Sequence, residues 1–369
     1  MKLSKVVLKG YKSTNETQEV NLGDLTIMIG ANGSGKSNFI SLFLLLNFLT
    51  SGGLQTHIAS HGFADSFLYM GSAKTLRTEI ELHFYDQENT DIYRFVLAYS
   101  VGGNMIFAEE TIKWQKQQSK EPRIVLLGNG YRESSLKDRA MAGDRTCSVV
   151  YENLARVKTF HFHNTDLTAK IRDSGFIEDN QYLRDNAGNL AAFLYSMREN
   201  EYKYYQRIKN HIQEIFPQFE DFDLHPMSSN PKYINLNWRG KGSDMLFGAH
   251  QISDGSLRFM ALITLLLQPP KTMPNTIILD EPELGLHPSA IIKLAALLKA
   301  ASSKTQIIAA TQSAMLLNEM SPDDVCVVNF DQQKQCSIYK RLEQEKLVDW
   351  LNNYTLGQLW EKNVLGGKP

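Results

Sequence analysis

The chain has few cysteines, almost no net charge and no long hydrophobic run. Its 369 residues include three cysteines, Cys147, Cys326 and Cys336, whose number and spacing exclude a disulfide framework and a zinc site. The 39 Lys and Arg residues nearly balance the 40 Asp and Glu residues, which excludes a globally basic surface for nucleic acid. These absences indicate a reduced, cytoplasmic protein that contacts nucleic acid, if at all, through local patches.

No segment has the character of a membrane span or a secretory signal. The most apolar run, residues 39–49, is interrupted by Ser41 and Asn47 and is shorter than the roughly 20 residues that cross a bilayer. The N-terminus starts at once with an alternating, strand-like pattern and has no apolar signal core. We therefore expect no export and no membrane contact.

What the sequence does contain is a glycine-rich turn between an apolar strand and an apolar helix. Residues 25–38 read LTIMIGANGSGKSN and match the pattern G-x-x-x-x-G-K-S/T. Glycines let the backbone approach an anion, and free N–H groups at the helix start point toward phosphates. We expect this P-loop to bind nucleotide through Gly30, Asn32, Gly33, Ser34, Gly35, Lys36, Ser37 and Asn38. Lys36 would reach the β- and γ-phosphates, and the Ser37 hydroxyl would bind Mg²⁺.

A second apolar strand, residues 276–279, ends in two carboxylates, Asp280 and Glu281. A P-loop ATPase needs one acid for Mg²⁺ and a second to polarise the attacking water. We assign Asp280 to the metal and Glu281 to the catalytic base. A strand that ends in an acidic turn is the plainer interpretation, and the upstream P-loop favours the catalytic one.

Two further segments fit the same chemistry. A helix from Pro288 and a strand at residues 306–310 lead to Gln312, and strand-helix-strand order places Gln312 at the sheet edge of Asp280, as a catalytic γ-phosphate sensor. Upstream, Ser253 and Gly255 precede the apolar helix at residues 259–267, where a helix N-terminus can bind an anion. Any capped helix would show the same pattern.

The rest of the chain predicts a β layer followed by helices. Alternating strands at residues 2–9, 78–85 and 92–100, of which the last two form a hairpin, continue at 105–115 and 123–127. Helices are expected at 180–195 and 199–216. No internal repeat and no long coiled coil occurs.

Three local features have two interpretations each. The basic stretch 115–145, which includes Lys120, Arg123 and Arg145, favours a solvated, loop-rich face over a nucleic-acid or partner surface. The basic and aromatic segment 198–209 favours an amphipathic helix over a base-stacking platform. His161 and His163 favour satisfied structural histidines over a metal site, because no other ligands lie at a suitable spacing.

Together these motifs resemble the ABC-type ATPase heads of the SMC and RecF class, and more closely the stand-alone RecF-like AAA-family ATPases of bacterial antiphage defence operons. The resemblance rests on GANGSGKSN, ISDGSLRF, IILDEP, ELGLHP and ATQS, with softer matches in FHFHNTD and LGQLWEKNVLGGKP. It implies an α/β head with a mixed central sheet, an antiparallel β layer and a mainly helical signature lobe. We expect the nucleotide-binding lobe at residues 1–115 and 265–369, and the signature lobe at 116–264.

The resemblance also implies a head-to-tail homodimer, which could extend to a higher oligomer. ATP and Mg²⁺ held by Lys36 and Ser37 of one subunit would be capped by Ser253 and Gly255 of the other, and Glu281 would drive hydrolysis. Relatives with an attached Toprim nuclease carry a further domain, so the effector expected here is a separate polypeptide, with a nuclease favoured.

The sequence departs from the wider ABC pattern at two positions. Asp254 replaces a signature glycine and Gln312 replaces the switch histidine, which implies slow or partner-tuned hydrolysis. No Q-loop glutamine could be assigned. Two alternatives therefore stay open: a RecF-like DNA-repair ATPase, and a nucleotide-gated scaffold that scarcely hydrolyses ATP and holds an effector inactive. An ABC importer subunit ranks last, since no transporter-coupling pattern occurs.

Overall fold

The computed structural model describes residues 1–86, 88–116 and 121–367. Lys120 of the basic stretch and the last two residues of the C-terminal motif, Lys368 and Pro369, lie outside these ranges. Within them, no helix combines the length and the apolar character that crossing a membrane requires.

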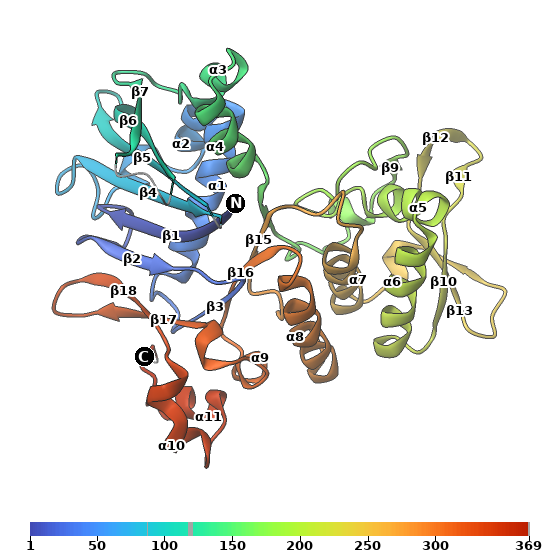
Figure 1. The fold of residues 1–369 in the computed structure, drawn as a ribbon. Coiled ribbons are helices and arrows are strands. Elements are labelled where there is room, and N and C mark those ends of the chain that lie inside the picture. Colours follow the sequence, from blue (N-terminus) through green and yellow to red (C-terminus); the bar gives the residue numbers. More distant parts are fainter. Residues whose placement is uncertain (87, 117–120, 368–369) are drawn as a thin grey trace.

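An antiparallel sheet forms the first layer of the molecule (Figure 1). Its described strands lie in the order β2-β1-β4-β5-β6-β7. Every second residue of β4, from Thr78 to Phe84, is buried, as the alternating sequence pattern predicts. The predicted hairpin is confirmed, since Glu79 of β4 pairs with Val96 of β5. The strands are β1 (Lys2–Lys9), β2 (Gln18–Asn21), β4 (Arg77–Tyr85), β5 (Asn89–Ser100), β6 (Asn104–Lys116) and β7 (Arg123–Gly128).

The second large sheet is mixed and carries the P-loop strand. Its described strands lie in the order β18-β17-β3-β16-β15-β8, and all neighbours are parallel except β17 and β18. All five residues of β3 are buried, as expected for a parallel strand covered on both faces. The strands are β3 (Leu25–Ile29), β8 (Val157–Phe160), β15 (Thr276–Asp280), β16 (Gln306–Thr311), β17 (Val325–Asp331) and β18 (Cys336–Arg341).

Two hydrophobic cores cover the two faces of the mixed sheet. Met28 of β3 packs into the core that the mixed sheet shares with the antiparallel sheet, whereas Ile27 packs into the core on the opposite face. Helix α1 lies between the two sheets (Figure 1). The helices that contribute to the first core are α1 (Lys36–Ser51), α2 (Leu54–Ser60), α3 (Leu136–Met141) and α4 (Arg145–Ala155).

A mainly helical lobe covers the other face of the mixed sheet. Its helices are α5 (Leu190–Asn200), α6 (Tyr202–Ile215) and α7 (Asp254–Leu267). Its short strands are β9 (Gly175–Phe176), β10 (Phe219–Asp223), β11 (Pro226–Met227), β12 (Asn230–Ile234), β13 (Asn237–Gly240) and β14 (Leu246–Phe247). After β15 follow α8 (Pro288–Ser302), α9 (Ala314–Asn318), α10 (Val348–Leu351) and α11 (Leu356–Glu361).

The prediction of a helix at 180–195 is wrong for its first half. Residues 180–189 form turns, because the Asn189 side chain accepts from the Arg184 N–H and donates to the carbonyls of Asp179 and Tyr182. Ala187 adopts a left-handed φ of 54°, which a helix does not allow. The helix predicted at 199–216 begins later, because Glu201 leaves the helical conformation between α5 and α6.

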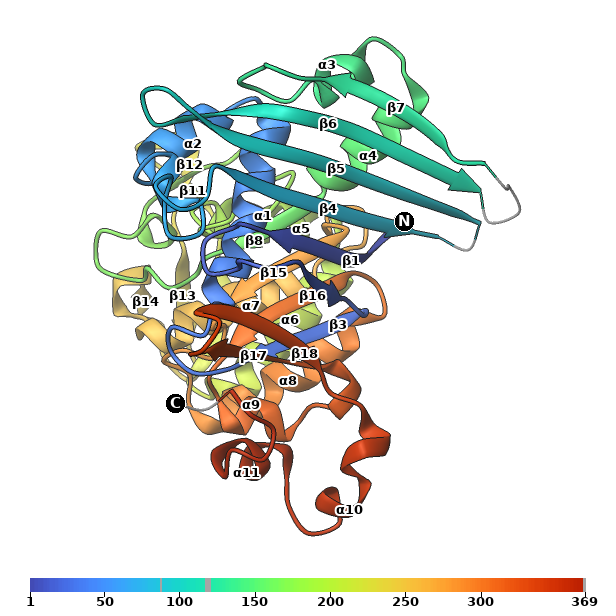
Figure 2. The same cartoon turned by 90° about the vertical axis from the view of Figure 1, so that its left-hand side faces the viewer.

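The segment 116–264 contributes to both large sheets as well as to the helical lobe. Strand β7 extends the antiparallel sheet, and β8 pairs with β15 in the mixed sheet. Because this segment is shared among three parts of the fold, its strand pairings do not fix where one lobe ends, and the lobe boundaries at 116 and 264 stay a prediction. Figure 2 looks onto the antiparallel sheet, with α10 and α11 at the opposite end of the molecule from β7.

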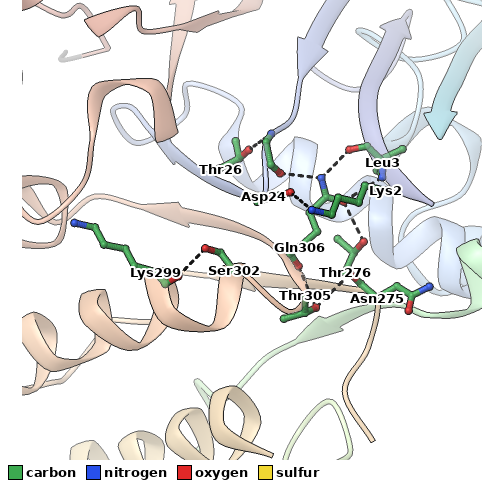
Figure 3. A network of polar contacts seen from close by, with 11 residues as sticks. Lys2, Leu3, Asp24, Thr26, Asn275, Thr276, Lys299, Ser302, Thr305 and Gln306 are labelled. Carbon is green, nitrogen blue, oxygen red and sulfur yellow. Dashed lines mark hydrogen bonds and ion pairs between the residues drawn. The ribbon is translucent and has the colours of Figure 1, made fainter. Parts of the chain in front are cut away.

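One buried glutamine joins the two large sheets. Gln306 Nε2 donates to the carbonyls of Leu3 (2.7 Å) and Gly23 (2.9 Å) (Figure 3). Its Oε1 accepts from the Leu3 N–H and from Thr276 Oγ1, each at 3.2 Å. This junction lies where β15 and β16 begin, so it fixes the sheets at the end opposite to the P-loop.

Candidate functional site

The carboxyl ends of three parallel strands bring the predicted residues to one sheet edge. Strand β16 lies between β3 and β15, and Ala310 of β16 is level with both Met28 and Asp280. The P-loop follows β3, and Gln312 follows β16. The placement predicted from strand order is therefore observed.

Two glycines of the P-loop are required by close contacts. A Cβ at Gly30 would collide with the carbonyl oxygen of Val328, and one at Gly35 would collide with Ser337 Oγ. Gly35 also has a φ of +110°, which L side chains rarely adopt. It is the N-cap of α1, so the loop enters the helix with free N–H groups. Asn32 and Gly33 are exposed at the tip of the loop.

Lys36 is 4% exposed and lies over the loop. Its Nζ donates to the carbonyls of Gly30 (2.6 Å) and Ala31 (3.0 Å). Burial lowers the pKa of Lys36, and the charges of Glu281 and Asp280 oppose this. In the described part of the chain this ammonium has no salt bridge, so an incoming phosphate would offer it a stronger partner than the two carbonyls.

Two serines far from the P-loop in sequence support it. Ser337 Oγ donates to the Ser34 carbonyl at 2.6 Å, and Asn38 Nδ2 donates to Ser13 Oγ at 2.9 Å. Ser337 also hydrogen-bonds Ser13 at 2.8 Å. Neither Ser13 nor Ser337 lies in a recognisable motif, so the sequence gives no signal for them.

The carboxylates at the end of β15, of which Asp280 is its last residue, lie against the P-loop. Asp280 Oδ1 is buried without a partner among the described residues. Burial raises the pKa of Asp280, the neighbouring Glu281 raises it further, and a hydrogen bond from Ser37 opposes both. An unpaired carboxylate oxygen beside a hydroxyl is the oxygen ligand set that Mg²⁺ takes in nucleotide sites. Ser37 and Asp280 therefore fit this ion.

The described residues contain no group of three or more His, Cys, Asp or Glu that could hold a metal ion by itself. Mg²⁺ at phosphates is usually bound by one or two protein side chains plus water and phosphate oxygens, so this finding is consistent with that ion.

Glu281 and Gln312 contact each other directly. The Gln312 amide donates from Nε2 to Glu281 Oε1, and its backbone N–H donates to Glu283 Oε1 at 3.3 Å. Glu281 has a left-handed φ of 40°, with its N–H donating to the Ala310 carbonyl at 2.8 Å. Strained backbone of this kind is common at functional sites. Burial raises the pKa of Glu283.

The two histidines after β8 lie beside Asp280. His161 Nε2 and His163 Nδ1 are buried without a hydrogen-bond partner among the described residues, which differs from the expected satisfied histidines. Burial lowers the pKa of His161, and the charge of Asp280 opposes this. Their spacing was visible in the sequence, but the pairing of β8 with β15 that brings them to Asp280 was not.

The signature-like residues are separate from the P-loop of the same chain. Ser253 is the exposed N-cap of α7, and its Oγ accepts from the Ser256 N–H at 3.2 Å. A Cβ at Gly255 would collide with the carbonyl of Gly285. Among the described residues, no hydrogen bond joins Ser253 or Gly255 to the P-loop.

Two arginines that sequence reasoning missed hold the start of α7. Arg258, 8% exposed, donates to the carbonyls of Phe162 (3.0 Å), His163 (2.8 Å) and Leu284. Arg172 donates to the Asp254 carboxylate at 2.6 Å. The aspartate that replaces a signature glycine therefore anchors the loop to Arg172.

A strand order that brings the P-loop, the two carboxylates and Gln312 to one sheet edge defines an ABC-type ATPase head. Comparison with solved structures supports this fold class. An SMC head bound to the C-terminal winged-helix domain of ScpA is similar, with 17% identity, coverage of 95% of this chain and 100% of that chain, and a TM-score of 0.58. An SMC head with an extended coiled coil, bound to the C-terminal domain of ScpA from Pyrococcus furiosus, has 16% identity, 95% and 98% coverage and the same TM-score.

The chain belongs to the family described as "AAA domain, putative AbiEii toxin, Type IV TA system", whose model matches residues 25–318. It is an ATPase of the SMC/AAA kind, as the resemblance predicts, and the predicted fold class is confirmed. In the described ranges no long coiled coil is evident. A comparison with curated proteins gave no match.

Proposed function

We propose that this chain binds ATP and Mg²⁺, closes head to tail into a homodimer, hydrolyses the nucleotide and thereby controls a separate effector, a nuclease by preference, in bacterial antiviral defence. The observation that carries the enzymatic part is the shared sheet edge at which Lys36, Asp280, Glu281 and Gln312 lie, with Gln312 bonded to Glu281.

The roles follow from the positions of the side chains. Lys36 and the loop N–H groups bind phosphate oxygens, and Ser37 and Asp280 hold Mg²⁺, which neutralises phosphate charge when bound. Glu281 accepts the proton of the attacking water, and Gln312 holds the Glu281 carboxylate in place through its amide.

Exposed residues around α7 support the dimer. Ser253 is exposed, and Leu284, in the neighbouring ELGLHP loop, is an apolar side chain that is 49% exposed. A two-fold interface would place these residues over the P-loop of a second copy, where the α7 N-terminus could cap the nucleotide. The similar SMC heads are bound to ScpA domains, and a head of this fold in our chain would likewise hold its effector.

The test measures ATP turnover by the purified wild type, Lys36→Ala and Glu281→Gln, each alone and with the product of the adjacent gene. We expect turnover only in the wild type. Turnover that does not exceed that of Lys36→Ala under both conditions would exclude the enzymatic role. A pull-down with Glu281→Gln, expected to trap the closed state, identifies the effector.

A nucleotide-gated scaffold is the second candidate. The Gln312 amide donates to Glu281 Oε1, and Arg172 donates to the Asp254 carboxylate. Two carboxylates near the expected reaction site therefore already have hydrogen-bond partners, which favours slow hydrolysis. A scaffold predicts tight ATP binding with less than one turnover over the assay. Rapid multiple turnover that Glu281→Gln abolishes would exclude it.

A further inference from the structure

A cavity of about 630 Å³ lies at the end of the two sheets remote from the P-loop. Asn275, which lines it, directly precedes β15, whereas Asp280 ends that strand. Five residues of extended strand, at about 3.3 Å each, separate the two by about 16 Å. Figure 3 shows Asn275 beside the Gln306 junction, and Figure 2 shows the N-terminus near the ends of β4, β5 and β6. The cavity is therefore distinct from the candidate ATP site.

Three neighbouring strands present an aspartate, a tryptophan and an arginine in one row. Asp91 of β5 pairs with Trp114 of β6, which pairs with Arg123 of β7. Directly paired residues share a face, with Cβ atoms about 5 Å apart. This face is the inner one, because Tyr93 and Phe95 on the same side of β5 are fully buried. The row therefore lies on the same face of the sheet as the buried core residues and extends from them to the cavity.

The cavity gathers arginines from the basic stretch and its flank. Arg123 begins β7, Arg145 begins α4 and Arg156 directly follows α4. Within the described ranges none of the three forms an ion pair, although Arg156 donates to the Met273 carbonyl at 3.0 Å. Arginines that line one cavity and have guanidinium donors outside any ion pair are suited to a phosphate.

The acceptor in the row is a buried carboxylate without a partner. Asp91 is 2% exposed, and its Oδ1 has no hydrogen bond in the described part of the chain. Burial and the nearby Asp86 raise the pKa of Asp91 to about 6, the N-terminal ammonium opposes this rise, and Asp91 is therefore mostly ionised at pH 7.5. A buried orphan acceptor costs stability, so a ligand that donates to it restores a partner.

The cavity lining carries charges of both signs, which restricts the class of ligand that it can bind. Asp86 and Glu152 also line the cavity, so one phosphate group of a ligand can face the guanidiniums, whereas further phosphates would have to lie outside the cavity. A ligand with one anionic end, a flat aromatic ring and N–H or O–H donors matches the side chains better. The cavity volume is within the usual range of about 300–1,000 Å³ for small-molecule sites.

We propose that this cavity binds one nucleotide unit, with its base on the Trp114 ring, base or sugar donors on Asp91, and its phosphate against Arg123, Arg145 and Arg156. The unit comes either from a free nucleoside monophosphate or from the 5′-phosphorylated end of a nucleic-acid strand. This site is additional to the ATP site of the proposed function.

The experiment uses full-length Lys36→Ala protein, which disables the P-loop and leaves the second site. Equilibrium dialysis measures binding of AMP, adenosine, a 5′-phosphorylated trinucleotide and the same trinucleotide without phosphate. We expect one phosphorylated ligand per chain, with the unphosphorylated counterpart at least tenfold weaker. Arg145→Ala and Trp114→Leu should each weaken binding at least tenfold, whereas Trp114→Phe, which keeps an aromatic ring, should weaken it less.

Lys137→Ala is the matched control, because Lys137 lies in the same basic stretch, on α3, and does not line the cavity. Tighter binding of AMP supports a free nucleotide as the source, and tighter binding of the phosphorylated trinucleotide supports a strand end. The proposal is overturned if no probe binds at millimolar concentration, or if Arg145→Ala and Trp114→Leu bind as well as Lys137→Ala. Both variants change the cavity wall outside the P-loop, so this result is independent of ATP turnover.

Discussion

Replacing Arg258 by methionine tests whether one side chain holds α7 to the loops around the acid cluster. The guanidinium donates to the carbonyls of Phe162, His163 and Leu284. The bond to Phe162 is buried, and the other two are partly buried. Methionine fills a similar volume without a charge, so the main change is the loss of these three donors.

The magnitude follows from the burial of each carbonyl. A buried group left without its partner costs about 1–3 kcal/mol. We assign about 2 kcal/mol to Phe162 and about 1 kcal/mol to each of the other two, which water reaches in part. Burial lowers the pKa of Arg258, so removing the charge returns part of this cost. The expected loss in free energy of unfolding is therefore about 3 kcal/mol.

Urea unfolding at pH 7.5 measures this loss. Arg132→Met is the control, because Arg132 is exposed and its guanidinium bonds, among the described residues, only the side chain of Asn104, so the free energy of unfolding should change by less than about 0.5 kcal/mol. A loss below about 1 kcal/mol in Arg258→Met would refute the role of the three carbonyl bonds.

Three further predictions concern single side chains. Asp91→Asn should raise the free energy of unfolding by about 2 kcal/mol at pH 7.5, since the folded-state pKa of about 6 exceeds the unfolded value. Protonation of Asp91 removes its buried charge from the wild type, so the difference in free energy of unfolding, measured by urea unfolding, should vanish as the pH falls from 6 to 4. A difference that does not depend on pH would contradict this prediction. Gly255→Ala should lower ATP turnover at least tenfold, because its Cβ displaces the Gly285 carbonyl, whereas Gly175→Ala, whose Cβ would meet no atom closer than 3.8 Å, should not. Gln312→Ala frees the Glu281 carboxylate and should lower kcat about tenfold with little change in KM, and an unchanged kcat would count against the contact.

Much of the fold was predictable because it depends on local patterns. Strand β3, the glycine-rich turn and α1 are contiguous, so their order fixes the P-loop. The parallel order of β15 and β16 then placed Gln312 near Glu281. The helix predicted at 180–195 does not form over residues 180–189, because the Asn189 side chain forms hydrogen bonds that compete with a helix.

The parts that could not be predicted depend on contacts between distant segments. Arg258 meets the carbonyl of His163, which is 95 residues away, and nothing in either motif indicates this. His161 and His163 approach Asp280 only because β8 pairs with β15. The row of Asp91, Trp114 and Arg123 depends on strand register, which the alternation of β5 and β6 alone does not set.

The central claim is that each ATP site is composed of two copies of the chain. Lys36→Ala disables the P-loop of a subunit, and Ser253→Arg blocks the α7 N-terminus that would cap the partner's nucleotide. Each variant alone should be inactive. A dimer with one subunit of each kind retains one site in which both halves are intact.

Subunit mixing therefore tests the claim most directly, with ATP turnover measured for each variant and for their equimolar mixture. Random pairing gives half mixed dimers with one intact site each, so the mixture should recover about a quarter of wild-type turnover. If the mixture shows no more turnover than the two variants measured separately, the composite site is contradicted.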